Sequence, residues 1–218
     1  MRKIYVAKDA NQILKDYLQA HGYELELVSS KGLVDPAISN HPDVFLCRLG
    51  LGAEAPLVRA TYDELAAGYP AEAAFNAACT GKFFIHNLKV TNPRLLAAAE
   101  AARDAGMELI HVPQGYAKCS TVIVDTRSII TYDRGIAKAC SAFNELDVLL
   151  VSPGYVVLPG YATGFIGGCS GRIGDEVVFN GDLSAHPDFL RICDFIGARG
   201  LKCTWFSQYP LTDIGSIV

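Results

Sequence analysis

The chain has 218 residues and a formal net charge of −4, and 50% of its residues are hydrophobic while 19% are charged. This length and composition predict a folded core and exclude long disordered segments. The acidic balance disfavours a nucleic-acid-binding surface, which needs clustered Lys and Arg, and no apolar run reaches the roughly 20 residues of a membrane span.

Hydrophobic periodicity and turn residues predict short strands that alternate with helices along the whole chain. The predicted strands are 4–7, 23–28, 44–47, 83–86, 107–112, 121–124, 128–131, 147–152, 177–180, 201–206 and 215–218. Helices are predicted before Gly22, over 61–67, from Pro93 to Gly106, over 133–143 and from Pro187 to Gly200. The fold class is therefore α/β.

One segment of this pattern occurs twice. Residues 81–124 align without a gap with residues 175–218, which lie 94 positions further along the chain. Pro93 and Pro187 stand where a helix begins in each copy, and a glycine stands where each helix ends. Each copy is thus predicted to form a strand, a helix and two further strands.

We interpret the 94-residue spacing as two steps of a unit of about 44 residues, which gives five units in a single domain, 1–218. Both ends of the chain are apolar strands, and pairing between them would close the units into a ring. The predicted fold is an α/β-propeller of five strand-helix-strand-strand units around a central axis. The predicted units span 1–50, 51–81, 82–127, 128–174 and 175–218.

Equivalent loops of such units meet at the axis, and several of them carry chemistry-bearing side chains. A Gly-Tyr pair is followed by a Cys-Ser or Cys-Thr pair in three units, at Cys79, Cys119 and Cys169. Cys119 and Asp213 occupy the same position in the two aligned segments. They are therefore predicted to face each other across a central cavity.

Five units in a ring resemble the pentein fold of guanidine-modifying enzymes and ribosome anti-association factors. The segment 112–120 is similar to the arginine deiminase and dimethylargininase segment that carries the catalytic histidine, and 69–91 resembles an uncharacterised bacterial pentein-related family. The resemblance implies hydrolysis or amidino transfer at a guanidine carbon by a cysteine enzyme. Tyr116, Ala117 and Lys118 stand here at the family's histidine run, and Asp213 stands at its cysteine.

A relocated catalytic site is the functional hypothesis that follows. Guanidine hydrolysis needs a thiolate, a proton donor and a carboxylate that holds the cation. We predict Cys119 as the nucleophile, Asp213 as the cation binder and Lys118 as the proton donor, with Tyr116 as the alternative donor. Residues predicted to bind the substrate are Tyr116, Asn76, Tyr161, Cys169, Cys79, Asp35 and Arg48. The alternative is that the cysteines are small apolar residues at strand ends.

Other motifs do not indicate a different chemistry. No histidine pair has the H-x-x-x-H spacing of a metal site, and His41 and His186 lie in His-Pro-Asp runs that are typical of turns or helix starts. The glycine-rich run 164–171 lacks the Gly-Lys-Ser/Thr of a phosphate loop, so close approach of backbones explains its glycines better. We therefore expect no metal and no cofactor.

Two functions stay open at this point. The first is a small-molecule-binding protein, an enzyme or not, that acts on a guanidino or ureido compound in an axial pocket. The second is a non-catalytic protein-interaction module like the ribosome factors. The seven cysteines, without a C-x-x-C pair, are typical of reduced thiols in a cytoplasmic protein. We expect no nucleic-acid or membrane partner, and a homodimer is one alternative for the assembly.

Overall fold

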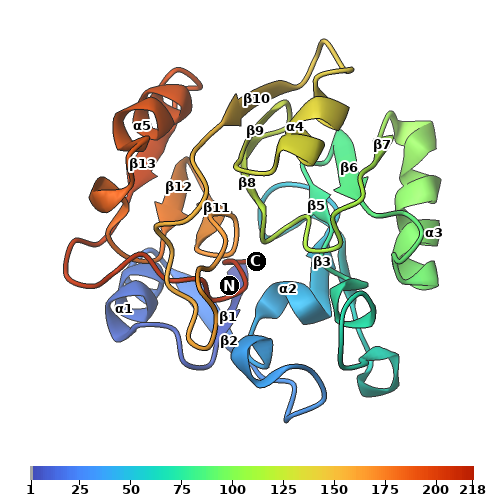
Figure 1. Ribbon diagram of the computed structural model, residues 1–218, viewed down its shortest axis with the longest axis horizontal. Helices are drawn as coiled ribbons and strands as arrows, with labels where there is room; N and C mark the ends of the chain where they lie inside the picture. Colours follow the sequence, from blue (N-terminus) through green and yellow to red (C-terminus); the bar gives the residue numbers. More distant parts are fainter. Residues whose placement is uncertain (1) are drawn as a thin grey trace.

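Figure 1 shows a computed structural model that describes residues 2–218. The strands are β1 (Arg2–Ala7), β2 (Tyr23–Val28), β3 (Leu46–Arg48), β4 (Leu57–Arg59), β5 (Ala78–Cys79), β6 (Phe83–His86), β7 (Glu108–His111), β8 (Thr121–Asp125), β9 (Ser128–Thr131), β10 (Asp147–Leu150), β11 (Ser170–Ile173), β12 (Glu176–Phe179) and β13 (Lys202–Thr204). The helices are α1 (Gln12–Ala20), α2 (Pro42–Phe45), α3 (Pro93–Ala101), α4 (Arg134–Cys140) and α5 (Phe189–Gly197).

Three sheets have three strands each and share one topology. In the sheet β5-β6-β7 the first pair is antiparallel and the second is parallel, with α3 connecting the two parallel strands. The sheets β8-β9-β10 and β11-β12-β13 repeat this order with α4 and α5. Gly106 and Gly200 follow the helical segments with φ of 92° and 71°, a left-handed conformation that glycine adopts without strain. The strand-helix-strand part of the predicted repeat is confirmed.

The predicted propeller of five equal units closed into a ring is wrong. Within residues 2–218 the strands form five separate small sheets, and β1-β2 and β3-β4 have only two strands each. The predicted helix at 61–67 is a single 3-10 turn, Tyr62–Glu64, and the predicted strand at 215–218 does not form. Residues 205–218 pair with the rest through isolated bridges at Pro210 and Thr212, and proline has no N–H for a strand ladder. The protein is therefore a mixed α/β protein in which the repeat extends over three units.

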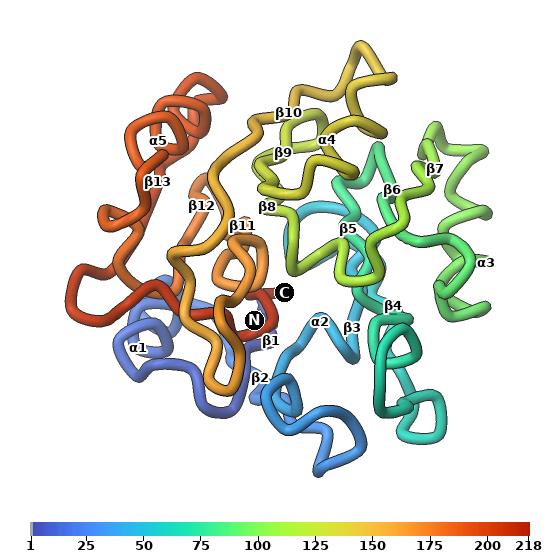
Figure 2. Tube along the Cα trace, in the orientation of Figure 1, coloured from blue at the N-terminus to red at the C-terminus, as the bar shows by residue number. Residues whose placement is uncertain are grey.

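The two ends of the described chain nevertheless pair with each other. The N–H of Tyr5 donates to the carbonyl of Val218 at 2.7 Å, and the N–H of Val218 donates back at 3.1 Å. Figures 1 and 2 mark both ends near the middle of the molecule. The pairing predicted for the chain ends is thus confirmed at this residue pair, although no strand surrounds Val218.

The longer helices lie on the outside of the molecule and bury one face each against the sheets (Figure 1). Leu14 and Leu18 of α1 are fully buried one turn apart, and so are Ile192 and Ile196 of α5. Burial of each such side chain contributes roughly 1.5–3 kcal/mol to folding. The short strands β3, β5, β8 and β11, together with residues 215–218, lie near the middle; we call them the inner strands.

The glycine-rich run 164–171 packs against neighbouring backbone and the Asp213 side chain. A Cβ at Gly167 would overlap the carbonyl of Lys118, and a Cβ at Gly168 would overlap the carboxylate of Asp213. The interpretation of these glycines as sites of close approach is confirmed. Among residues 2–218, no helix combines the length and the hydropathy that crossing a membrane would require.

Candidate functional site: a buried polar cluster and an adjoining cavity

Seven polar side chains meet where the loops enter the inner strands, and we call them the polar cluster. Its members are His41, Asp43, Asn76, Lys118, Cys119, Asp213 and Ser216. Six of the seven are at most 4% exposed, and Lys118 is partly buried. Buried polar groups on this scale lower stability unless they are paired, so their concentration is typical of a functional site.

The backbones of the loops hold the cluster together. Asn76 donates from Nδ2 to the carbonyl of Asp43 at 3.3 Å and accepts at Oδ1 from the N–H of Cys119 at 3.0 Å. The N–H of Gly168 donates to the carbonyl of Cys119 at 2.8 Å, and the N–H of Asp43 donates to the carbonyl of Gly215 at 3.1 Å. Each loop thus positions the side chains of its neighbours.

Asp43 reaches the cluster because of Pro42. A proline is favoured in the first helical turn, and here it opens α2 directly after His41. Residues 44 and 45, predicted as part of a strand, therefore belong to this short helix, and Asp43 is fully buried in its first turn. The His-Pro-Asp run that indicated only a helix start carries two members of the cluster.

Cys119 contacts a carboxylate and an amide. Its Sγ donates to Asp43 Oδ2 at 3.0 Å and accepts from Asn76 Nδ2 at 3.2 Å. Burial raises the pKa of the Cys119 thiol well above its usual value, and the negative charges of Asp43 and Asp213 act in the same direction. The sulfur is therefore a thiol in this closed state.

Asp43 also joins Cys119 to Lys118. Ser216 Oγ donates to Asp43 Oδ2 at 2.7 Å, and Lys118 Nζ donates to Ser216 Oγ at 2.8 Å. Burial raises the pKa of Asp43, while the charge of Lys118 opposes this rise. Ser216 has a φ of 72°, an uncommon conformation for a serine that places its hydroxyl between the two charged groups.

Asp213 is held by backbone donors. The N–H of Phe165 donates to Oδ2 at 2.9 Å and the N–H of Gly215 donates to Oδ1 at 3.0 Å. Burial nevertheless raises the pKa of Asp213 to about 6, because these donors and Lys118 only partly offset the loss of water. Its carboxyl thus titrates close to neutral pH.

His41 faces Asp213 without a hydrogen bond. Its Nδ1 lies 3.8 Å from Asp213 Oδ1 and has no hydrogen-bond partner, and burial lowers the pKa of the imidazole. One ligand atom each of His41, Cys119 and Asp213 lies within 4.8 Å of the other two. The structure thus brings together a set of groups that can hold a metal ion, which the spacing along the sequence did not indicate.

The residues predicted for the site fall in four places. Cys119, Asp213, Lys118 and Asn76 come together in the polar cluster, and the predicted proximity of Cys119 and Asp213 is seen there. Cys169 lies in the apolar core, where its thiol donates to the carbonyl of Ile166 at 3.0 Å. The remaining residues lie outside the cluster.

An aromatic row lies beside the cluster, and three of the predicted binding residues, Tyr116, Tyr161 and Asp35, belong to this side of the molecule. The Tyr116 ring lies tilted against the rings of Tyr69 and Phe165, with ring centroids 5.5 and 6.2 Å away, and its hydroxyl donates to Glu72. Tyr161 is 54% exposed, and desolvation and the neighbouring carboxylate of Asp35 raise the pKa of its hydroxyl. This side therefore offers aromatic rings with the carboxylates of Glu72 and Asp35.

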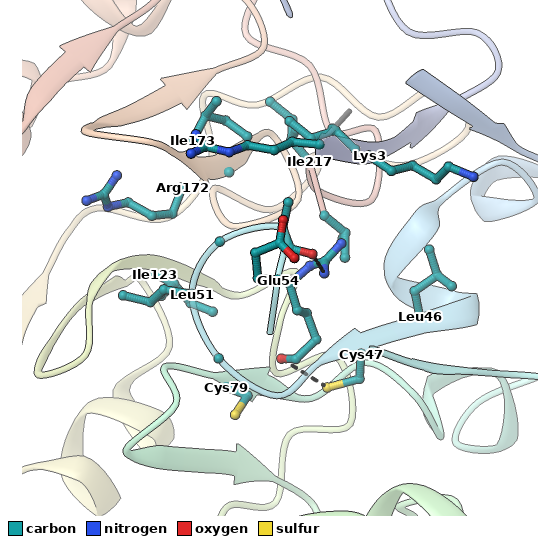
Figure 3. A pocket seen from close by; sticks show the side chains of 18 of the residues that line it. Lys3, Leu46, Cys47, Leu51, Glu54, Cys79, Ile123, Arg172, Ile173 and Ile217 are labelled. Carbon is teal, nitrogen blue, oxygen red and sulfur yellow. Dashed lines mark hydrogen bonds between the residues drawn. The ribbon is translucent and has the colours of Figure 1, made fainter. Parts of the chain in front are cut away.

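A cavity of about 410 Å³ lies at the opposite ends of the inner strands (Figure 3). Predicted binding residues Arg48 and Cys79 line this cavity, as does Lys118, whereas Tyr116, Cys119 and Asp213 do not. Its apolar wall includes Ile4, Leu46, Cys47, Leu51, Ile123, Ile173 and Ile217. This cavity is therefore not a pocket that Tyr116, Cys119 and Asp213 share, and Lys118 is common to the cluster and the cavity.

Sequence reasoning missed His41, Asp43 and Ser216. The sequence does contain a signal that points to cluster positions, since Asn76, Cys119 and Gly168 each lie two residues before an inner strand. Asp43 lies three residues before β3 and follows the same rule approximately. Ser216 gave no signal, because its place depends on a left-handed backbone conformation.

The fold and the polar cluster define a mixed α/β protein with titratable groups buried between its loops. A comparison with models of known families then shows to which family the chain belongs. Residues 54–218 match the model of a family of unknown function, and because they are more than half of the chain, the protein belongs to that family. The family is DUF6873. His41, Asp43 and Arg48 precede the matched range.

No curated protein and no solved structure is significantly similar to the chain. The comparisons do not bear on the resemblance to the pentein superfamily, which stays a prediction.

Proposed function

We propose that the protein is a hydrolase or transferase that acts on a C–N bond of a small guanidino or ureido compound, with Cys119 as the nucleophile. The observation that carries this proposal is the convergence of a thiol, two carboxylates and an imidazole in the polar cluster. Cys119 Sγ lies 3.0 Å from Asp43 Oδ2, and His41 and Asp213 lie within 4.8 Å. A thiol, a base and a group that orients the base are the parts of a cysteine nucleophile site.

The charges of the cluster favour a cationic substrate. Asp43 and Asp213 stand near the sulfur, and within residues 2–218 neither forms an ion pair with a lysine or arginine: Lys118 reaches Asp43 through Ser216. A guanidinium bound between the two carboxylates would supply the missing positive charge. It would also lower the pKa of the Cys119 thiol, because a nearby cation favours the thiolate.

The reaction balances with the groups present. Cys119 passes its proton to Asp43 Oδ2, and the thiolate forms a C–S bond with the guanidine carbon. The C–N bond then breaks, and the departing amine takes the proton from Asp43. Water attacks the resulting S-linked carbon while His41 accepts a proton at Nδ1. Cleavage of the C–S bond then gives the ureido product, and His41 returns that proton to the sulfur, which restores the thiol. In a transferase a second amine takes the place of water.

The cluster is closed in this structure, since Cys119 and Asp213 are each 3% exposed. The proposal therefore includes movement of the aromatic row at Tyr116 and Phe165 when substrate enters. The carboxylates of Glu72 and Asp35 on that side would attract a cation, and aromatic rings bind cations through their faces. Lys118 acts as a positioning residue that holds Ser216 and moderates the pKa of Asp43.

Affinity labelling tests the nucleophile. 2-Chloroacetamidine carries an amidinium like the proposed substrate, and attack by a thiolate displaces chloride; 2-chloroacetamide is the neutral control. We expect the amidine to label Cys119, and the amide to label chiefly the more exposed Cys193 and Cys203, with the adducts located by mass spectrometry. Asp213→Asn should slow labelling of Cys119 at least tenfold. The same labelling pattern with both reagents would contradict the proposal.

Turnover gives the second measurement. Release of amine or ammonia would be followed with arginine, agmatine, methylated arginines and creatine. We expect a substrate among them whose turnover is lost in Cys119→Ser and retained in Cys140→Ser, a buried thiol on α4 outside the cluster. Turnover that survives in Cys119→Ser would exclude the nucleophile assigned here.

A second candidate is a metal-dependent hydrolase that uses the same atoms. The favouring observation is the unpartnered His41 Nδ1 beside Cys119 and Asp213, since Zn²⁺ binds imidazole, thiolate and carboxylate ligands. Zinc titration against a chromophoric chelator separates the two candidates. One tightly bound equivalent that is lost in His41→Gln and protects Cys119 from the amidine would replace the nucleophile proposal with the metal-dependent one.

A further inference from the structure

The cavity at the far ends of the inner strands has the form of a second ligand site, separate from the polar cluster. Its volume of about 410 Å³ lies in the range of small-molecule pockets. It opens between β1, β3, β11 and the loop 50–54. Cys119 and Asp213, which the proposed reaction uses, do not line it. Any ligand bound here would thus lie apart from the proposed nucleophile.

The charged side chains of the cavity are mostly cationic. The basic lining residues are Arg2, Lys3, Arg48, Lys118 and Arg172, and the acidic one is Glu54. Figure 3 shows Lys3 and Arg172 pointing away from the centre of the cavity. Lys3 pairs with Glu26 at 3.3 Å, and Arg172 Nε donates to the carbonyl of Val124 at 2.9 Å. Arg48 is therefore the guanidinium that we consider as the ligand-binding group of the cavity.

The guanidinium of Arg48 has N–H groups that are not engaged by residues 2–218. Its Nη1 donates to the carbonyls of Ala53 and Ala55, at 2.8 and 3.1 Å, which fixes the side chain against the loop 50–55. Among residues 2–218, no hydrogen bond or ion pair is found for its Nε and Nη2, and neither atom is sealed from solvent. Burial lowers the pKa of Arg48, which marks a partly desolvated cation. A guanidinium held in this way can donate two parallel hydrogen bonds to the two oxygens of a carboxylate.

The remaining wall is apolar. Leu51, Ile123, Ile173 and Ile217 are labelled around the cavity in Figure 3. An apolar wall with one anchoring cation suits a ligand that has an apolar body and one anionic end. The carboxylate of Glu54 lines the same cavity as Arg48, which disfavours a doubly charged phosphate. A single negative charge fits better.

From these observations, we propose that the cavity binds a small amphipathic carboxylate, with Arg48 holding the carboxylate and the apolar wall holding the body. Lys118 lines the same cavity, and its Nζ contacts Ser216 of the polar cluster. The bound ligand thus occupies a cavity that is also lined by a side chain in contact with the polar cluster. The proposal stands independently of the proposed reaction, because it needs no participation of Cys119.

Calorimetric titration with straight-chain carboxylates from acetate to octanoate, and with the matching primary alcohols, tests this site on the full chain. We expect affinity to rise by up to about fourfold for each CH₂ group that reaches the wall. Each carboxylate should bind at least tenfold more tightly than its alcohol. Alcohols that bind as well as the carboxylates, or inorganic phosphate that displaces octanoate at equal concentration, would overturn the proposal.

Variants locate the site. Arg48→Gln should weaken octanoate binding at least tenfold, whereas Arg127→Gln, an equal charge change at an exposed arginine outside the cavity, should leave it unchanged. Glu54→Gln should strengthen binding, because it removes the competing carboxylate. If Arg48→Gln fails to fold, Leu51→Trp, which fills the cavity without a charge change, takes its place with the same expected loss. The site would be refuted if the affinity for octanoate were unchanged in Glu54→Gln and also unchanged in Arg48→Gln or Leu51→Trp. This outcome does not depend on the result of the Cys119 experiments.

Discussion

The two ends of the inner strands differ in every physical respect. At one end, seven polar side chains fill the space between the loops, and a Cβ at Gly168 finds no room. At the other end, the strands open onto a cavity of about 410 Å³ with a largely apolar wall. The difference teaches that the chain buries its carboxyl, thiol and imidazole groups where packing is tightest, and that it leaves empty space where the wall is largely apolar. Lys118 is the side chain that belongs to both.

This arrangement has an energetic cost at the closed end. Burying carboxyl, imidazole and ammonium groups together is unfavourable unless each is paired, and His41 Nδ1 and Asp43 Oδ1 have no partner. The apolar clusters behind α1, α3, α4 and α5 offset that cost. Variants in or beside the closed end should therefore change stability more than matched variants elsewhere in the molecule, and three experiments measure by how much.

The largest effect is expected from Gly168→Ala. The added methyl group would overlap the Asp213 carboxylate, so the loop or the carboxylate must move, at a cost of about 3 kcal/mol or more in the free energy of unfolding. Gly197→Ala on α5 is the matched control, because a Cβ there meets nothing within 4 Å. Urea unfolding followed by Trp205 fluorescence measures both. A Gly168→Ala protein within about 0.5 kcal/mol of the parent would show that the closed end is loosely packed.

The second effect is the pH dependence that Asp213 confers. Its pKa is about 6 in the folded protein against a usual 3.8, so the folded state binds more protons than the unfolded state between these values. Stability from this group is present below about pH 4 and falls as the pH rises to about 6. Relative to the parent, Asp213→Asn should therefore gain about 3 kcal/mol between pH 4 and pH 7.

The other titrating groups are common to both proteins and cancel in that difference. Asp104→Asn, at an exposed carboxylate, is the control and should track the parent at every pH. Urea unfolding at a series of pH values supplies the numbers. The free energy of unfolding of Asp213→Asn could instead differ from that of the parent by the same amount at every pH. That result would mean that this carboxyl titrates normally and that the closed end is better hydrated than its burial indicates.

The smallest effect is expected at the aromatic row. Tyr116→Phe removes the hydroxyl that donates to Glu72, and hydrogen bonds to charged groups contribute about 1.5–3 kcal/mol. Tyr155→Phe, at a tyrosine that is 60% exposed, should change stability by less than about 0.5 kcal/mol. Thermal unfolding compares the two. Equal and small effects would indicate that the aromatic row moves freely, which would ease entry to the polar cluster.

The sequence predicts the regular parts of this fold well because local rules decide them. The predicted strands 83–86 and 128–131 coincide with β6 and β9, and the proline of the first repeat copy stands at the start of α3. The predicted meeting of Cys119 and Asp213 came from the repeat, because aligned positions on similar units occupy similar places. These successes rest on periodicity, caps and internal similarity.

The failures come from interactions between distant segments. The closed ring was extrapolated from three similar units to the dissimilar segments at 1–50 and 51–81, where β3 and β4 form a separate pair. His41 is predicted only to lie at a turn or helix start, because nothing in its own neighbourhood shows that Asp213 lies opposite. Cavity-lining Arg48 was predicted to bind substrate at the axis, yet it lies at the other end of the inner strands from Cys119.

The pairing of Tyr5 with Val218 has a consequence for biosynthesis. The ribosome makes Tyr5 long before Val218, so β1 cannot form these hydrogen bonds until residue 218 has emerged. The same holds for Asp43, whose hydrogen bond from Ser216 spans 173 positions of the chain. A nascent chain that has not yet reached Ser216 therefore leaves Asp43 without this donor, and the polar cluster can be completed only late in synthesis.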